Sequence, residues 1–509
     1  MQKFFQGAFL LIAANLINRI LGFIYKVYTV RLIGAEGIGL FELVFPIYNL
    51  VLVLTTAGIP LAIPKLISEE FARHNYKQVK KIFLVALFIL ATSGFLSTTV
   101  LLWSAPYLSI KFFSDQRVYW SFVVTLPAIF IVAISSAFRG YFQGMQNMLP
   151  GSTSQVVEQI VRFTVGIIAV QFLLPYGLEL AAAGLALAMV SGEFAGLLSL
   201  VAFFWKKRIN QISLKYFKNE RTNILRILSS IYKIAIPTTL TRVILAATLT
   251  AEAIIIPIRL INSGLTMSQA TQSYGQFSGM AFSLINLPTI ITVSLAISLV
   301  PAISEALALN DYNLIRKRTN QVLKITIYTA IPCLVIFFYL SRNIMQVVYN
   351  TTEASAILAT LALGCPFFYL QQTTNGILQG LGKVNLIFKN ALIGSIVTLA
   401  GIYWLTALPN IGIQGASMAV IAGSVIISYL NFVSLLKFTH LKPNWFQILF
   451  APIFGGIGMY YFLNSFFQNI GGWFSLVWAC MLSFALYSLI LIITGCIKLK
   501  RIYVSLKWF

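Results

Sequence analysis

The feature that most constrains this chain is a series of long apolar segments separated by short polar ones. Each is close to the roughly 20 residues that a helix needs to cross the hydrocarbon core of a bilayer. Only 10% of the 509 residues are charged and 59% are hydrophobic, whereas about a quarter of the residues in soluble domains are charged. The sequence therefore predicts an all-α polytopic membrane protein with fourteen transmembrane helices. The fourteen apolar segments are 4–31, 38–66, 82–107, 118–137, 155–175, 181–205, 231–258, 276–302, 323–341, 354–376, 389–408, 415–436, 445–467 and 473–496.

Lysine and arginine residues gather in alternate polar segments. With the N-terminus inside, most of the 36 cations fall on the cytoplasmic side, where the positive-inside rule puts them. We therefore expect a multi-pass protein of the cytoplasmic membrane with both termini in the cytoplasm. This placement also accounts for the net charge of +23, so no nucleic-acid partner is expected. The basic segment 206–230 is either a helix lying on anionic membrane lipid or a solvated tether.

Short motifs recur along the chain at nearly one spacing. The GxxQG motif that begins at Gly140 recurs at Gly376, and the Ser-Glu pair at Ser68 recurs at Ser304 with the same spacing, here called the repeat offset. Such recurrence is typical of an internal repeat. Six spans per copy is an even number, so the copies should have the same orientation and be related by a pseudo-two-fold axis along the membrane normal. The predicted domains are a six-helix lobe (1–205), a basic linker (206–230), a second six-helix lobe (231–436) and an additional helix pair (445–496).

Two cations lie inside the first apolar segment. Arg19 and Lys26 are seven residues apart, which is two helical turns, so they share a helix face. A cation at mid-bilayer costs about 2.5–3.5 kcal/mol, so it must face protein, water or an anion. We expect Arg19 to line a functional cavity. The alternative is a cation that extends to the lipid headgroups, which suits Arg31, at the end of the segment, better than Arg19.

The repeat relates the seventh apolar segment to the first. It makes Arg242 equivalent to Arg19, and in a two-lobe transporter such positions face each other across the central cavity. Two arginines there form an anion site suited to bidentate phosphate contact. Glu252, on the same segment as Arg242, either balances the cavity charge or binds a coupling proton or cation. The alternative is a structural ion pair of Glu252 with Lys26 or Arg242.

Other charges and glycines predict packing rather than binding. Glu158 and Arg162 have the i, i+4 spacing of a local ion pair. The spacing of Gly184, Gly192 and neighbouring small residues predicts a close-packed helix face, with Glu193 beside it. The sequence has no phosphate loop, dinucleotide fingerprint, metal-ligand cluster or nucleophile elbow. We therefore expect no enzyme activity, and no catalytic residue, metal or cofactor.

Several motifs together resemble one family. They are FRGYFQG at 138–144, SQVVEQ at 154–159, LPYG at 174–177 and LVPAISE at 299–305. They resemble the stage V sporulation protein B family of the multidrug/oligosaccharidyl-lipid/polysaccharide exporter superfamily, a relative of the lipid II flippase. The resemblance covers essentially the whole chain. It implies a V-shaped pair of six-helix lobes and two C-terminal helices that add a groove for a lipid tail.

The resemblance also implies a substrate and site residues. It implies export, by alternating access, of an undecaprenyl-pyrophosphate-linked saccharide, a peptidoglycan precursor for the spore cortex. The RILGF motif at 19–23 matches the first-span motif of the flippase, which assigns a cavity-arginine role to Arg19. The next flippase cavity arginine matches Tyr25, beside Lys26, and Ser283 stands where an eighth-span arginine would be. We therefore expect the pyrophosphate to bind Arg19, Arg242 and Lys26.

Other functions remain as alternatives. A cation-coupled multidrug exporter of the same superfamily would prefer acidic cavity residues for cationic substrates, whereas the predicted cavity is cationic. A non-transporting scaffold for sporulation-wall synthesis would be expected to carry a sizeable soluble domain. A membrane glycosyl polymerase would need a catalytic base on an outer loop, and the predicted outer loops are short and poor in acids.

Overall fold

The computed structural model describes residues 2–206, 221–441, 443–467 and 471–496. Every regular element in these ranges is a helix, as expected for an all-α protein. Most of the predicted basic linker, at 207–220, lies outside the described residues. The two interpretations of that linker, membrane-bound helix or tether, therefore stay predictions.

The chain packs into two compact units, which are described separately. Unit 1 comprises Met1–Ile261 with Leu265–Gly275, and unit 2 comprises Asn262–Gly264 with Gln276–Phe509. Unit 1 includes the seventh apolar segment, which the sequence repeat assigns to the second lobe. The predicted lobes at 1–205 and 231–436 were drawn from the sequence repeat, whereas the two units are defined by packing. The lobe boundaries therefore stay a prediction.

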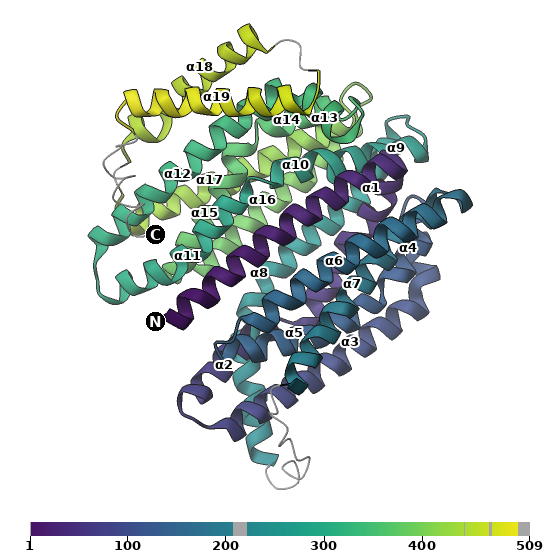
Figure 1. Cartoon of the computed structure of the whole chain (residues 1–509), viewed down its shortest axis with the longest axis vertical. Coiled ribbons are helices and arrows are strands. Elements are labelled where there is room, and N and C mark those ends of the chain that lie inside the picture. Colours follow the sequence, from purple (N-terminus) through teal and green to yellow (C-terminus); the bar gives the residue numbers. More distant parts are fainter. Residues whose placement is uncertain (1, 207–220, 442, 468–470, 497–509) are drawn as a thin grey trace. The chain divides into compact units, whose positions relative to one another are not determined.

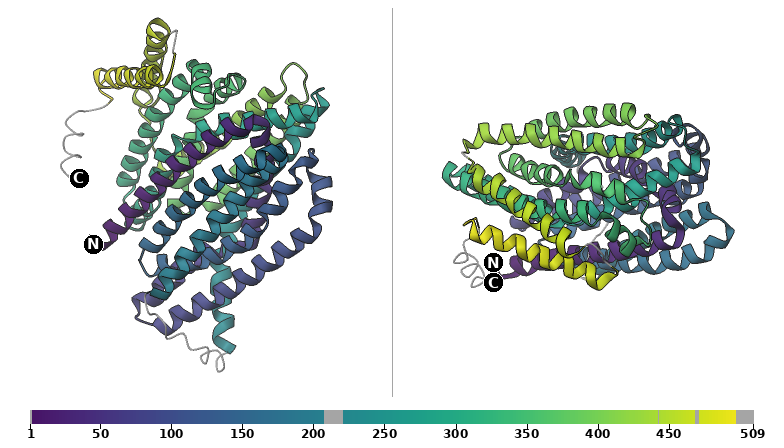
Figure 2. Two further views of the ribbon diagram at one scale, coloured as in Figure 1. Left: turned by 45° about the vertical axis from the view of Figure 1, so that its right-hand side comes forward. Right: turned by 90° about the horizontal axis from the view of Figure 1, so that it is seen from above.

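Unit 1 is organised around α6, which packs extensively on α7 and on α1. Most of its helices run alongside one another in the left view of Figure 2. Its elements are α1 (Gln2–Thr56), α2 (Ile59–Ala72), α3 (Tyr76–Phe112), η1 (Gln116–Val118), α4 (Tyr119–Thr125), α5 (Pro127–Gly144), α6 (Leu149–Leu173), η2 (Leu174–Tyr176), α7 (Leu178–Lys206), α8 (Arg221–Asn262) and α9 (Met267–Tyr274) (Figure 1).

Unit 2 has its most extensive contacts between α16 and α17 and between α11 and α15. The pair α18 and α19 packs together, and α18 also packs on α12. The elements are η4 (Gly275–Ala281), α10 (Phe282–Asn286), α11 (Thr289–Ala308), α12 (Tyr312–Tyr339), α13 (Ser341–Tyr349), α14 (Ser355–Ala362), α15 (Cys365–Gly380), α16 (Val384–Leu405), α17 (Ile413–Thr439), η5 (Phe446–Phe450), α18 (Ala451–Phe466) and α19 (Trp473–Ile493).

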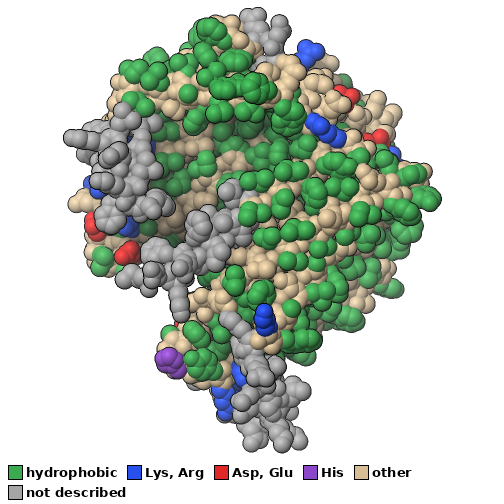
Figure 3. Space-filling model, viewed as in Figure 1, with side chains coloured by type: hydrophobic (Ala, Val, Ile, Leu, Met, Phe, Trp, Pro, Cys, Tyr) green, Lys and Arg blue, Asp and Glu red, His purple; other side chains and the backbone are tan. Residues whose placement is uncertain are grey.

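Twelve stretches of the described chain are helical, long and apolar enough to cross a membrane. One of them, Ile17–Ala72, covers two of the fourteen predicted segments. Another predicted segment, 354–376, is broken into the short helices α14 and α15, and Pro366 lies in the first turn of α15. Hydrophobic side chains are spread widely over the face seen in Figure 3, and few charged ones lie among them, as expected for spans that face lipid.

Gly34 divides α1 into two helices. Its backbone angles (φ 68°, ψ −176°) are not helical, and a positive φ favours glycine because it lacks a Cβ atom. Polar side chains hold this corner: Arg117 Nη2 lies 2.7 Å from both Glu36 Oε1 and Asp115 Oδ2. The Thr271 hydroxyl of α9 donates to Asp115 Oδ2 (2.9 Å). The corner is therefore joined to η1 and α9.

The Asp115 carboxylate of this corner is only 1% exposed. Burial disfavours its charged form, but hydrogen bonds from Arg117 and Thr271 outweigh burial and lower the pKa of the Asp115 carboxyl below its usual value. Asp115 therefore stabilises the corner as an anion.

One turn recurs in the two halves of the chain. His74, before α3, and Asn310, before α12, are related by the repeat offset, and both have a left-handed φ, 57° and 53°. The next residue caps its helix in both places. Asn75 and Asp311 each accept a backbone N–H of the third residue after them, at 3.2 and 2.9 Å. This shared geometry supports the repeat predicted from the motif spacing.

Glycines allow equivalent helix pairs to approach closely. A Cβ atom on Gly192 of α7 would lie 2.8 Å from Glu158 O of α6. A Cβ atom on Gly423 of α17 would lie 2.9 Å from Gly394 O of α16. Glu158 and Gly394 are again related by the repeat offset. The predicted close-packed glycine face of α7 is confirmed, and α17 packs in the corresponding way.

Candidate functional site

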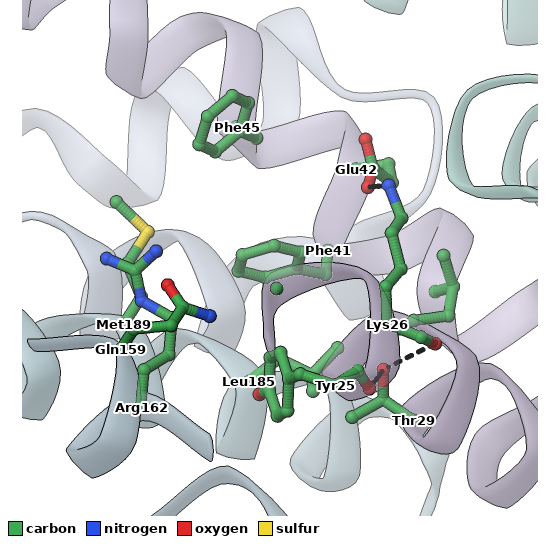
Figure 4. A pocket seen from close by; sticks show the side chains of 12 residues that line it. Tyr25, Lys26, Thr29, Phe41, Glu42, Phe45, Gln159, Arg162, Leu185 and Met189 are labelled. Carbon is green, nitrogen blue, oxygen red and sulfur yellow. Dashed lines mark hydrogen bonds and ion pairs between the residues drawn. The ribbon is translucent and has the colours of Figure 1, made fainter. Parts of the chain in front are cut away.

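A cavity of about 270 Å³ lies within unit 1, between the two halves of α1 and the helices α6 and α7 (Figure 4). Most of its lining is apolar, and the charged residues are Lys26, Glu42 and Arg162. The lining comprises Gly22, Tyr25, Lys26 and Thr29 from before Gly34, Ile38, Phe41, Glu42 and Phe45 from after it, Gln159 and Arg162 from α6, and Leu185 and Met189 from α7.

Lys26 forms an ion pair across the corner of α1. Its Nζ lies 2.7 Å from Glu42 Oε1, and the two side chains are 26% and 14% exposed. The residues are 16 apart in sequence, which in a straight helix would separate them by about 24 Å along the axis. The pair therefore exists because the chain turns at Gly34. Figure 4 shows Lys26 reaching toward Glu42, with Arg162 and Gln159 across the cavity.

Four charged residues form a network beside the cavity, here called the four-charge network (Arg139, Glu158, Arg162 and Glu193). Arg162 Nη2 donates to Glu158 Oε1 (2.8 Å) and to Glu193 Oε1 (3.2 Å). Arg139 Nη2 donates to Glu158 Oε2 (2.8 Å) and lies 3.9 Å from Glu193 Oε2. Two cations and two carboxylates thus neutralise one another between α5, α6 and α7. The predicted pair of Glu158 and Arg162 is confirmed, and the network supplies the partners of Glu193.

The network fixes the part of Arg162 that borders the cavity. Two carboxylates hold one end of its guanidinium, and Gly192 lets α7 approach close enough to bring Glu193 there. Removing one member of such a partly buried group would leave an opposite charge with fewer partners in a poorly solvated place. Arg162 is therefore a rigidly held cation, whereas Lys26 carries its charge on a flexible side chain with three donors.

Arg19 lies on α1 outside the lining of this cavity. Its side chain is partly exposed, and it comes three residues before Gly22, where the lining begins. Positions 19, 22, 26 and 29 follow one face of a helix, so Arg19 extends the cavity-facing stripe by one turn. The structure thus puts Lys26 in the cavity and Arg19 beside it on the same face. The binding role of both residues stays a prediction.

The two predicted residues of the seventh segment lie on α8. Arg242 is exposed and Glu252 is partly buried, and neither lines the cavity of unit 1. The Thr250 hydroxyl of the same helix donates to Pro46 O of α1 (2.9 Å). Of the two structural pairs considered for Glu252, the one with Lys26 is not formed among the described residues, because Lys26 pairs with Glu42. The functional roles of Arg242 and Glu252 stay predictions.

Sequence reasoning did not single out Glu42, Gln159 or Arg139 as site residues. A signal for Glu42 was present, because it is an acidic residue inside an apolar segment, which is the same signal that identified Arg19. Nothing in the sequence paired Glu42 with Lys26, since the turn between them depends on the backbone at Gly34. Arg139 is brought to Glu158 only by the packing of α5 on α6.

Comparisons with known proteins bear on the whole chain. The sequence pattern of the polysaccharide biosynthesis protein family matches residues 4–307, and that of MatE matches residues 278–404. Stage V sporulation protein B of Bacillus subtilis (strain 168) is 33% identical over 516 residues, with 98% of each chain covered. The chain belongs to the stage V sporulation protein B family.

The chain is also similar to a lipid II flippase in sequence, and to two solved transporter structures in fold. The lipid II flippase MurJ of the same organism is 25% identical over 416 residues, covering 78% of this chain and 76% of that protein. A solved structure of lipid II flippase MurJ, in an inward closed conformation, aligns with a TM-score of 0.69 at 16% identity, covering 94% and 97% of the two chains. An inward-facing multidrug resistance MATE family transporter of the MOP superfamily aligns with a TM-score of 0.70 at 14% identity, covering 83% and 94%.

These similarities show which class of membrane protein the chain belongs to. It is a multi-pass membrane protein with the fold of MATE and MurJ transporters. It belongs to a family of membrane transporters rather than enzymes, and it is related to the lipid II flippase.

Proposed function

We propose that this protein moves an undecaprenyl-pyrophosphate-linked saccharide across the cytoplasmic membrane by alternating access. The observation that carries the proposal is Lys26, a cation inside a cavity of the membrane-spanning region that is paired with the carboxylate of Glu42. A cation in that place is costly unless an anion pairs with it. A pyrophosphate is such an anion, and it makes stronger charge-assisted hydrogen bonds than a neutral group does.

The pyrophosphate is proposed to bind Arg19, Lys26 and Arg242. Arg19 and Arg242 offer planar forks for bidentate contact, whereas Lys26 acts as a point charge that exchanges Glu42 for the substrate. Glu252 either balances the charge of the cavity or binds the coupling proton or cation. The driving force is then the membrane potential or that coupled ion.

The saccharide is proposed to cross through a wet cavity while the prenyl tail stays in lipid. The additional helix pair at 445–496 provides the groove for the tail. By likeness to stage V sporulation protein B, the saccharide is a peptidoglycan precursor for the spore cortex. The protein spans the membrane fourteen times as two parallel-repeat lobes, with both termini in the cytoplasm, an orientation that the distribution of lysine and arginine supports.

Reconstitution into liposomes tests this function. Purified protein should move an undecaprenyl-pyrophosphate-linked disaccharide between leaflets, and Lys26→Met should abolish most of that movement. Lys324→Met is the matched control, because Lys324 lies on α12 outside this cavity, where it contacts Gln447. Parent protein that moves no lipid-linked saccharide, or that moves cationic drugs instead, would contradict the proposal and favour the cation-coupled multidrug exporter.

A further inference from the structure

Unit 2 contains a second cavity, of about 460 Å³, between α11 and α15. Its size is within the range of about 300–1,000 Å³ that is usual for small-molecule sites. One wall, from α11, is mainly apolar. The other wall, from α15, presents Gln372, Asn375 and Gln379, which are spaced by three and four residues and so share one helix face. This face, called the amide face, has three neutral polar side chains.

Asn375 is held in one orientation by a buried network. Asn431 Nδ2 donates to Asn375 Oδ1 (2.8 Å) and to Thr374 Oγ1 (3.2 Å). Asn390 Nδ2 donates in turn to Asn431 Oδ1 (2.9 Å). Asn431 is 0% and Asn390 7% exposed. Because this network engages the oxygen of the Asn375 amide, its NH₂ group is the end left to donate to a ligand in the cavity.

Gln372 and Gln379 lie one turn to either side of Asn375, and both side chains are exposed. Their amides both donate and accept hydrogen bonds. Gly376, between them, brings α15 close to α11, since a Cβ atom there would lie 2.8 Å from Ala296 Cα. The backbone under the amide face is therefore tightly packed, and its side chains extend from a rigid base.

Two of the three repeat-equivalent positions differ in unit 1: Ser136 and Arg139 match Gln372 and Asn375, whereas Gln143 matches Gln379. The repeat offset also relates Gly394 to Glu158, so unit 2 lacks the charged pair that Arg139 and Glu158 form in unit 1. The three amides carry no formal charge, so they offer a ligand hydrogen bonds but no ion pair. Hydroxyl and acetamido groups offer the mixture of donors and acceptors that amides match.

We propose that Gln372, Asn375 and Gln379 bind the saccharide part of the transported lipid through hydrogen bonds to its hydroxyl and acetamido groups. This inference rests on the proposed function and names a saccharide subsite within unit 2, separate from the cations proposed for the pyrophosphate. Specificity for the saccharide then depends on the amide face and not on the cavity cations.

The test compares two probes on protein in lipid nanodiscs. One is undecaprenyl pyrophosphate, and the other is the same lipid carrying an N-acetylated disaccharide. The double variant Gln372→Met, Gln379→Met should bind the disaccharide probe about tenfold more weakly, as expected for one or two lost neutral hydrogen bonds, and bind undecaprenyl pyrophosphate like the parent. Gln346→Met is the matched control, an exposed glutamine of α13 in the same unit that contacts Asn350 outside the cavity.

Each outcome decides between the two proposals. An unchanged affinity for the disaccharide probe, or an equal loss for both probes, overturns the sugar subsite and leaves the proposed function standing. A parent protein that binds neither probe overturns both. Because both glutamines are exposed, the double variant should unfold at the parent temperature. If the double variant unfolds at a lower temperature, Gln372→Met and Gln379→Met are each compared with the parent for binding of the two probes.

Discussion

Replacing Glu42 by Gln tests the role of the Lys26–Glu42 pair, because it should change stability and binding in opposite directions. The substitution keeps the shape of the side chain and removes its charge, so Lys26 loses its counter-ion at 2.7 Å. Stability should fall because a partly buried ammonium is left unpaired. Affinity for an anionic lipid should rise because the anion no longer has to displace Glu42.

The magnitude follows from the burial of the pair. Breaking a fully buried ion pair costs about 3–5 kcal/mol. The two side chains are 26% and 14% exposed, so solvent screens part of this interaction and about 1–3 kcal/mol is expected. About 1.4 kcal/mol corresponds to a tenfold change in affinity. We therefore expect a lower unfolding temperature and roughly tenfold tighter binding of undecaprenyl pyrophosphate.

The assay is thermal unfolding and lipid binding of protein in nanodiscs, with three variants. Lys26→Met should lose both stability and binding. The double variant Lys26→Met, Glu42→Gln should recover most of the stability but not the binding, because no charge is left unpaired. Weaker binding by Glu42→Gln than by the parent would refute the reasoning, since Glu42 would then assist the substrate rather than compete with it.

Three further predictions concern other parts of the molecule. Arg19→Ala should weaken binding of undecaprenyl pyrophosphate more than Arg19→Lys does, with little loss of expression; normal binding by the alanine variant defeats the role of Arg19 as an anion ligand. Gly192→Ala should destabilise the protein by about 1–3 kcal/mol in thermal unfolding, because its Cβ would lie 2.8 Å from Glu158 O. Gly151→Ala is the control and should leave the stability unchanged, because its Cβ would meet nothing within 4 Å. Equal unfolding temperatures for the two variants would contradict the close packing of α6 and α7. The Asp115 carboxyl has a folded-state pKa below its unfolded value of about 3.9. Its contribution to the free energy of unfolding is therefore complete above that pH and is lost as the pH falls toward the folded-state pKa. Asp115→Asn should reduce the loss of unfolding temperature on acidification, and an unchanged pH profile would show that Asp115 is not involved.

The amino-acid sequence by itself determined the class of fold and predicted a repeat. Long apolar segments must be helices in a membrane, whatever they pack against, because their backbone groups have to be satisfied within the segment. Similar turns at His74 and Asn310, and similar close helix approaches at Gly192 and Gly423, support the repeat predicted from the motif spacing. The pair of Glu158 and Arg162 was also predictable, because i, i+4 neighbours on a helix need no tertiary contact.

Only the tertiary structure decided which charges meet. Lys26 and Glu42 form a pair because the chain turns at Gly34, and a sequence of apolar residues does not state the angle of that turn. Arg139 reaches Glu158 through the packing of two helices, and the orientation of the Asn375 amide comes from Asn431 on a third helix. Hydropathy and helical periodicity describe one segment at a time, whereas each of these contacts joins residues from segments whose relative rotation is set by packing.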